Sequence, residues 1–180
     1  GFAASEGGAN HGRSPEESAY GLRQRMEVSR WLHDMPKITI AAIPGAAAGA
    51  GLSIALACDF RIAARGAKIT TAFAKVGLSG DFGGTYFLSQ LVGVAKAKEL
   101  YLLSDVILAE EAERLGVFNR AVGPKELQAE TMTLARRFAS GPPASRQWPM
   151  SPLVTDTSLT SWPSLAHFAA VPPAFSSASS

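Results

Sequence analysis

An apolar stretch over residues 38–58 constrains the possible folds of this chain more than any other part of its sequence. No apolar run within it is long enough to cross a bilayer, because Pro44 and three nearby glycines divide the stretch in the middle. A proline followed by closely spaced glycines ends a strand and begins a turn. We therefore expect a buried strand over residues 37–43, a glycine-rich turn, and a helix over residues 52–57 that is apolar on every side.

The composition favours a globular protein with a substantial core. Of 180 residues, 47% are hydrophobic and 18% are charged, and the net charge is +2. No dense basic run with interleaved aromatics is present, so we expect no nucleic-acid partner. The one cysteine, Cys58, excludes an internal disulfide, and no Cys/His spacing is typical of a metal site. The N-terminus carries no export signal, and we expect a cytoplasmic protein without a membrane partner.

Helical and strand-like patterns alternate along the rest of the chain, which predicts a layered α/β fold. Ser14, a proline and two glutamates are typical of a helix start, here of a helix over residues 16–32. A glycine-rich segment over residues 76–85 is too irregular for either pattern. The other expected elements are strands over residues 59–64, 69–73 and 118–122, and helices over residues 86–92, 95–103, 109–115 and 124–139.

The character of the chain changes after the Gly-Pro-Pro at residues 141–143. Between residues 145 and 180 only Arg146 and Asp156 are charged, and neither helical nor strand periodicity continues. We therefore divide the chain into a folded core over residues 1–143 and a Ser/Pro-rich, atypical or disordered tail over residues 144–180.

The glycine-rich turn before residue 52 directs free backbone N–H groups toward the space in front of a helix. A phosphate-binding loop would need Lys and Ser/Thr after its last glycine, where Leu52 and Ser53 stand. A dinucleotide fingerprint fails at Ile54. A thioester oxyanion remains as a candidate ligand, and a tight helix-packing contact remains as the structural alternative.

Asp81 lies among glycines just before an expected helix. On local sequence alone, an N-cap or turn aspartate is the favoured interpretation. A catalytic base would need a partly apolar pocket, for which Phe73, Phe82 and Tyr86 could supply the walls. Ser53 has no histidine partner in any motif, so it is interpreted as a packed residue.

Several motifs in order resemble the crotonase (enoyl-CoA hydratase/isomerase) family over about residues 15–143. They are the segment over residues 37–51, Ala57-Cys58-Asp59-Phe60-Arg61-Ile62-Ala63, the run over residues 72–78, the segment 81–86 and the segment 108–116. The resemblance implies a superhelix of stacked ββα units, here without its N-terminal part. It also implies a homotrimer or hexamer that acts on acyl-CoA thioesters, with no cofactor beyond the CoA of the substrate.

The family stabilises a thioester enolate with two backbone amides, and the second falls on Ala50, between Gly49 and Gly51. The first lies upstream of Gly1, so the resemblance implies an incomplete oxyanion hole and a weak or inactive chain. The two glutamates of hydratases fall on Ser53 and Phe73, which carry no acid. Isomerase-type members place their acid at Asp81, and the resemblance therefore favours double-bond isomerisation. Hydration, attack by Asp81 as a nucleophile in a hydrolase or dehalogenase, and a non-catalytic fragment are the alternatives.

Overall fold

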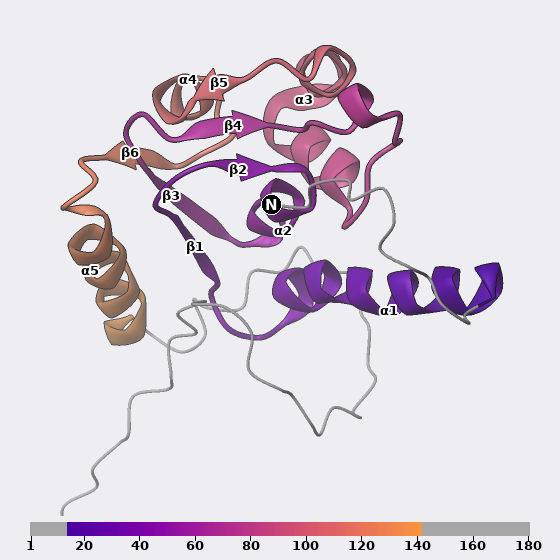
Figure 1. The fold of residues 1–180 in the computed structure, drawn as a ribbon. Helices are drawn as coiled ribbons and strands as arrows, with labels where there is room; N and C mark the ends of the chain where they lie inside the picture. The colour runs from indigo at the N-terminus through magenta and orange to yellow at the C-terminus, as the bar shows by residue number, and fades with distance from the viewer. Residues whose placement is uncertain (1–13, 142–180) are drawn as a thin grey trace, which may run out of the picture.

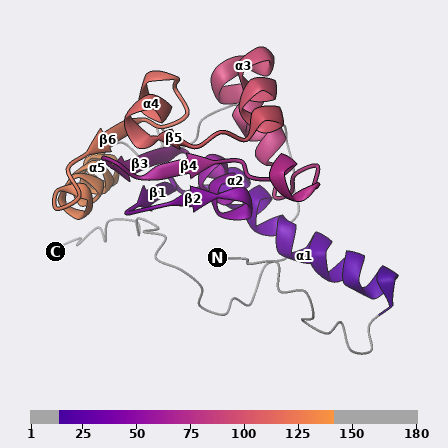
Figure 2. The ribbon, with the colours of Figure 1, turned by 45° about the horizontal axis from the view of Figure 1, so that its top comes forward.

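The computed structural model describes residues 14–141 of the chain. Within these residues, five α-helices pack around two three-stranded sheets (Figure 1). Helix α1 (Pro15–Asp34) extends from one side of this body, and α5 (Leu127–Ser140) lies on the opposite side (Figures 1 and 2). The expected tail over residues 144–180 lies outside the described residues.

The first sheet is parallel and has the order β1-β3-β6. It contains β1 (Ile40–Ile43), β3 (Phe60–Ala64) and β6 (Arg120–Val122). Side chains of β1 and β3 are largely buried on both faces, as expected of parallel strands that helices cover. The three predicted strands in this sheet are confirmed, each within a few residues of its expected bounds.

The second sheet has the order β2-β4-β5. Strand β2 (Ala47–Ala48) pairs in parallel with β4 (Lys68–Thr70), and β5 (Ile107–Leu108) pairs with β4 in the antiparallel direction. Strands β2 and β5 were not predicted, because two residues are too few to show strand periodicity. The consequence for the glycine-rich turn is that its end is held in a sheet directly before α2 (Gly49–Ala57).

Helix α1 begins where its sequence predicts. The Ser14 side chain accepts a hydrogen bond from the Glu17 N–H at 3.1 Å, and the Ser14 N–H donates to Glu17 Oε2 at 2.8 Å. This reciprocal pair is a capping box, with a proline in the first turn. The helix continues to Asp34, beyond the expected end at residue 32.

Helix α2 lies at the centre of the main core. Leu52, Ser53, Leu56 and Ala57 are buried, and α2 packs between α1 and α3 (Gly84–Leu103). The two helices expected over residues 86–103 form this one helix, which is interrupted at Gly93. The remaining elements are α4 (Ala109–Arg114) and the short 3₁₀ helix η1 (Ala74–Val76).

Arg61 is a charged residue that the core buries, with 4% of its surface exposed. Its guanidinium donates to the carbonyl oxygens of Cys58, Leu56 at 3.5 Å and Val117 at 2.9 Å. Burial is the main cause that lowers the pKa of Arg61 below its ordinary value. Two of these carbonyls lie at the C-terminal end of α2, so a cation stabilises the negative end of the helix.

Two further properties concern the described residues as a whole. Across residues 14–141, no helix combines the length and the apolar character that crossing a membrane requires. In the same part of the chain, the His, Cys, Asp and Glu side chains nowhere gather in threes that could hold a metal ion.

Candidate functional site

The first part of the candidate site is the N-terminal turn of α2. Gly49 begins this helix with a φ of 52°, a left-handed value that suits glycine, and the preceding Ala48 makes no side-chain cap. The N–H groups of a first helical turn have no partner inside the helix. Ala50, the second residue of α2, therefore offers its N–H at the positive end of the helix dipole. Among residues 14–141, no atom lies within 4 Å of a Cβ built at Gly51, so this part of the chain leaves that side of the turn open.

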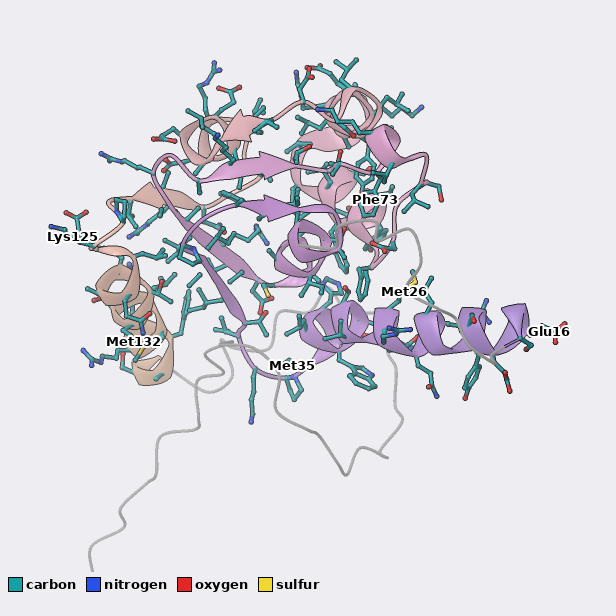
Figure 3. All side chains as sticks on the ribbon, in the orientation of Figure 1. Glu16, Met26, Met35, Phe73, Lys125 and Met132 are labelled. Atoms are coloured by element: carbon teal, nitrogen blue, oxygen red, sulfur yellow. The ribbon has the colours of Figure 1, made fainter. Side chains whose placement is uncertain are left out.

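Phe73 covers the same turn from the side of the second sheet. A Cβ at Gly49 would lie 3.8 Å from Phe73 Cζ, and Phe73 itself is 5% exposed. Figure 3 shows Phe73 near the end of β4 and α3. The residue before it, Ala72, has a φ of 61°, which is uncommon for a non-glycine residue. Phe73 is thus an apolar wall beside Gly49 and carries no group that transfers a proton.

Asp81 provides the carboxylate of the candidate site. Its Oδ1 is buried and has no hydrogen-bond partner among the described residues. Loss of hydration is the main cause that raises the pKa of Asp81 above its ordinary 3.8, and a hydrogen bond from its own N–H opposes this rise. Asp81 is not the N-cap of α3, because Gly83 occupies that position without any side-chain cap. The turn is stabilised by the Asp81 backbone, because the Asp81 carbonyl oxygen accepts a hydrogen bond from the Gly84 N–H at 3.0 Å.

The backbone around Asp81 is unusual. Gly80, Phe82 and Gly83 have φ values of 101°, 49° and 71°, so the residues on both sides of Asp81 are in left-handed or related conformations. Phe82 is not a glycine, and such a conformation costs it of order 1–3 kcal/mol. Backbone strain of this kind is concentrated at functional sites, where it fixes a side chain in a set direction.

Tyr101 connects the carboxylate to the turn of α2. Its ring stacks on Phe73 with centroids 5.9 Å apart and an interplanar angle of 3°. Burial is the main cause that raises the pKa of Tyr101, a hydrogen bond with Ser53 lowers it, and the Asp81 charge raises it. Ser53, one turn after Ala50, therefore lies near the Tyr101 hydroxyl, and the Asp81 charge raises the pKa of that hydroxyl. The structure groups the Ala50 turn, Phe73 and Asp81 around Ser53 and Tyr101.

The sequence did not predict that Tyr101 belongs to the candidate site. It lies in α3, 20 positions after Asp81, and no motif marks it among the other apolar residues of that helix. Only the packing of α3 against α2 brings its hydroxyl to Ser53. The sole available signal is a tyrosine in an otherwise aliphatic segment, which by itself indicates only a side chain that needs a polar neighbour.

A pocket of about 620 Å³ lies beside this group, between α1 and residues 82–87. Phe82 and Tyr86, both expected at a substrate site, line it, whereas Ala50, Gly49, Gly51, Phe73 and Asp81 do not. Met26 points from α1 toward the body of the fold at this position (Figure 3). The complete lining is Leu22, Arg23, Met26, Glu27, Ser29, Arg30, His33, Phe82, Gly83, Tyr86 and Phe87.

Gly84→Ala is expected to damage both the stability of the protein and the candidate site. A Cβ at Gly84 would collide with Ser53 Oγ and the Tyr101 hydroxyl, and would lie 3.0 Å from Ser53 Cβ. Forcing apart two side chains in a packed region costs roughly 1–3 kcal/mol. Urea unfolding of Gly84→Ala and of Gly51→Ala, where a Cβ meets no atom of the described residues, would measure the difference. Equal stabilities of the two variants would show that α2 and α3 are not in close contact at Gly84.

The sequence model of the family described as enoyl-CoA hydratase/isomerase matches residues 7–169. The chain belongs to the enoyl-CoA hydratase/isomerase family. Among relatives, it is 44% identical over 114 residues to a crotonyl-CoA hydratase from Syntrophomonas wolfei, covering 63% of this chain and 44% of that protein. It is 42% identical over 113 residues to the 1,2-epoxyphenylacetyl-CoA isomerase of Escherichia coli, covering 63% and 43%.

Solved structures confirm the expected crotonase-like fold. An enoyl-CoA hydratase from Polaromonas sp. JS666 matches with a TM-score of 0.70 at 34% identity, over 74% of this chain and 52% of that one. A putative enoyl-CoA hydratase from Thermobifida fusca in complex with acetoacetyl-CoA matches with a TM-score of 0.68 at 35% identity, over 71% and 50%. The chain spans about half the length of these relatives. Their names include both hydratases and an isomerase, so membership of the enoyl-CoA hydratase/isomerase family does not separate the two reactions.

Proposed function

We propose that this protein isomerises the double bond of an enoyl-CoA thioester, with Asp81 as its single proton shuttle and the Ala50 N–H as an oxyanion donor. The observation that carries the proposal is the buried Oδ1 of Asp81, which has no hydrogen-bond partner among the described residues. The Asp81 charge acts on Tyr101, whose ring stacks on Phe73 beside Gly49 at the N-terminal turn of α2. A carboxylate and a helix N-terminus at one place are the two groups that enolate chemistry requires.

The chemistry follows from where charge develops. When a base removes a proton from C2 of a 3-enoyl thioester, the electron pair spreads to the thioester oxygen and forms a dienolate with the C3–C4 double bond. A backbone N–H at a helix N-terminus stabilises this negative oxygen. The base then gives the proton to C4, the double bond moves from C3–C4 to C2–C3, and no atom is gained or lost. One carboxyl group therefore suffices, and the proposal needs no cofactor.

The environment of Asp81 suits both halves of this cycle. A carboxylate in water is a weak base, because its pKa lies far below neutrality. Lost hydration raises the pKa of Asp81, which makes its carboxylate a stronger base and its protonated form easier to retain between the two steps. The pocket beside it, lined by Phe82 and Tyr86, has the apolar character that an acyl chain requires.

Two residues favour isomerisation over hydration. The resemblance places the glutamates of hydratases at Ser53 and Phe73. The Ser53 hydroxyl donates to the Gly49 carbonyl at 3.1 Å, and Phe73 has no titratable group. Hydration by two acids would need one group to activate water and another to deliver a proton. Several relatives carry hydratase names, and the residues of this site are the reason to prefer the isomerase.

Isomerisation in deuterated water would test the proposal. We expect a 3-enoyl-CoA to become the 2-enoyl-CoA, with deuterium entering at C4 through exchange at the shuttle carboxyl. Conversion of a 2-enoyl-CoA to the 3-hydroxyacyl-CoA would identify a hydratase instead. A covalent aspartyl ester trapped at Asp81 would identify a nucleophilic hydrolase or dehalogenase. Binding of the thioester without any of these changes would identify a non-catalytic protein.

A further inference from the structure

We propose that Thr71 and Ser104 are positioning residues that fix the geometry of the oxyanion-binding turn at Ala50. They form a buried pair of hydroxyl groups between the end of β4 and the end of α3. No motif of the sequence marks either residue, and both act through the backbone segments that they join. The inference rests on the proposed function, because it explains how the same site holds its backbone donor in place.

The segment over residues 71–73 leaves β4 directly beside the first residue of α2. A Cβ built at Gly49 would lie 3.8 Å from the Thr71 carbonyl oxygen and 3.8 Å from Phe73 Cζ. The Gly49 carbonyl and the Ala50 N–H belong to one planar peptide group. Because the segment is in van der Waals contact with Gly49, its position limits the orientation of this peptide and the direction in which Ala50 donates.

Two buried hydroxyl groups attach this segment to the end of α3. Thr71 is 4% exposed and Ser104 is 0% exposed. Thr71 Oγ1 lies 3.0 Å from Ser104 Oγ and 3.0 Å from the Leu100 carbonyl oxygen. A threonine hydroxyl has one proton, and both of these acceptors lie at the end of α3. Whichever acceptor takes the proton, Thr71 is therefore bonded to α3.

The attachment holds two residues in conformations that are uncommon without glycine. Ala72 has a φ of 61° and Ser104 has a φ of 49°. The Thr70 hydroxyl joins them, because it donates to the Ser104 carbonyl oxygen at 3.0 Å and accepts the Ala72 N–H at 3.2 Å. Such conformations persist only where the surrounding structure over-determines them, and they are concentrated at functional sites. Here they set the direction in which the chain enters Phe73.

The same attachment fixes an aromatic wall of the site. The Phe73 ring stacks on Tyr101 with centroids 5.9 Å apart. Phe73 lies two residues after Thr71, and the Tyr101 carbonyl oxygen accepts a hydrogen bond from the Ser104 hydroxyl at 2.9 Å. The hydroxyl pair therefore holds the backbone on both sides of the stacked rings. Misplacement of a positioning group by about 1 Å can cost about 10²-fold in rate, so small movements of this wall and of the Ala50 turn should be measurable.

Thr71→Val tests the hydroxyl group while nearly keeping the shape of the side chain. We expect the isomerase kcat to fall by roughly ten- to a hundredfold, the cost of a misplacement of up to about 1 Å, with KM little changed. Thr71→Ser keeps the hydroxyl group and should retain most of the kcat. A kcat of Thr71→Val equal to that of the unmodified protein would overturn the inference.

Thr39→Val is the matched control for stability. Thr39 is also 4% exposed, and its Oγ1 lies 2.9 Å from Asp59 Oδ2, so this variant loses a buried, bonded hydroxyl group as well. Thr39 precedes β1, at the opposite end of that strand from the glycine-rich turn. We expect Thr39→Val to lower stability in urea as Thr71→Val does, without changing kcat. Equal losses of kcat in the two variants would show that Thr71 is only structural and would overturn the inference.

Ser104→Gly separates positioning from stability in the opposite way. Glycine adopts a φ of 49° readily, so the variant relieves backbone strain while it removes the hydroxyl group. We expect a Tm close to that of the unmodified protein and a lower kcat, with a smaller loss than in Thr71→Val because Thr71 keeps its Leu100 acceptor. This variant decides the question even if Thr71→Val does not fold. Full activity of Ser104→Gly would overturn the inference.

A measurement without substrate separates this inference from the proposed function. The amide ¹H–¹⁵N resonance of Ala50 in the full chain reports the surroundings of that N–H. We expect the resonance to move in Thr71→Val and Ser104→Gly and to stay in place in Thr71→Ser and Thr39→Val. Such movement without isomerisation by the unmodified protein would retain the positioning pair and refute the isomerase. Isomerisation by the unmodified protein with an unmoved Ala50 resonance in Thr71→Val would retain the isomerase and overturn the inference.

Discussion

Asp81→Asn is expected to lower the rate of double-bond isomerisation by about 10²–10⁴-fold, the usual contribution of a positioned proton-transfer group. The amide has nearly the shape of the carboxyl group but neither accepts nor returns the proton. Because Ala50 and the pocket beside Phe82 are unchanged, KM for the thioester should change far less than kcat. Steady-state kinetics with a 3-enoyl-CoA would measure both.

Asp105→Asn is the matched control, since Asp105 is exposed just beyond α3 and belongs to no part of the site. This variant should retain full activity. Turnover of Asp81→Asn close to that of Asp105→Asn would remove Asp81 from the mechanism. A loss confined to KM would mean that Asp81 binds substrate without transferring a proton.

The same substitution should raise the stability of the protein at neutral pH. The folded-state pKa of Asp81 lies above its ordinary 3.8, so ionised Asp81 is less favourable in the folded chain than in the unfolded one. This cost is absent below pH 3.8 and grows as pH rises through the folded pKa. Asparagine removes it, so the Tm of Asp81→Asn should exceed that of the unmodified protein at pH 7, and the difference should disappear as pH falls below 3.8.

Arg61→Met is expected to destabilise the fold by about 3–5 kcal/mol, the upper range for a single substitution. The change leaves the carbonyls of Leu56, Cys58 and Val117 buried without their donor. It also removes the cation at the negative end of α2. Methionine fills most of the volume of the arginine side chain. The lost stability therefore measures the missing hydrogen bonds and charge more than the effect of a cavity. Urea unfolding would measure the change in the free energy of unfolding.

Arg120→Met is the matched control for this prediction. Arg120 lies on the adjacent strand β6 and pairs with Glu130 at 3.3 Å, with half of its side chain exposed. An exposed ion pair contributes less than about 1 kcal/mol, so Arg120→Met should be nearly neutral. A comparable effect of the two substitutions would mean that the Arg61 carbonyl contacts do not stabilise the core.

Local patterns were sufficient for much of the fold. The capping box at Ser14 and Glu17 defined the start of α1, and Pro44 with its neighbouring glycines separated β1 from α2. These signals are readable because each depends on a few residues that are close in the chain. Strands β2 and β5 could not be predicted, because each forms by pairing with β4 and its own two residues show no strand pattern.

The sequence by itself determined the alternation of strands and helices, the free N–H groups before α2, and the presence of an acid at position 81. The sequence did not decide whether this acid caps a helix or acts as a catalytic base. Only the tertiary structure decided that Gly83 is the N-cap, that Asp81 Oδ1 is buried with no partner among the described residues, and that the Tyr101 hydroxyl and Ser53 both lie against Gly84. The physical reason is that hydration and side-chain contacts depend on groups from distant segments, here α2 and α3, whose approach no local pattern encodes.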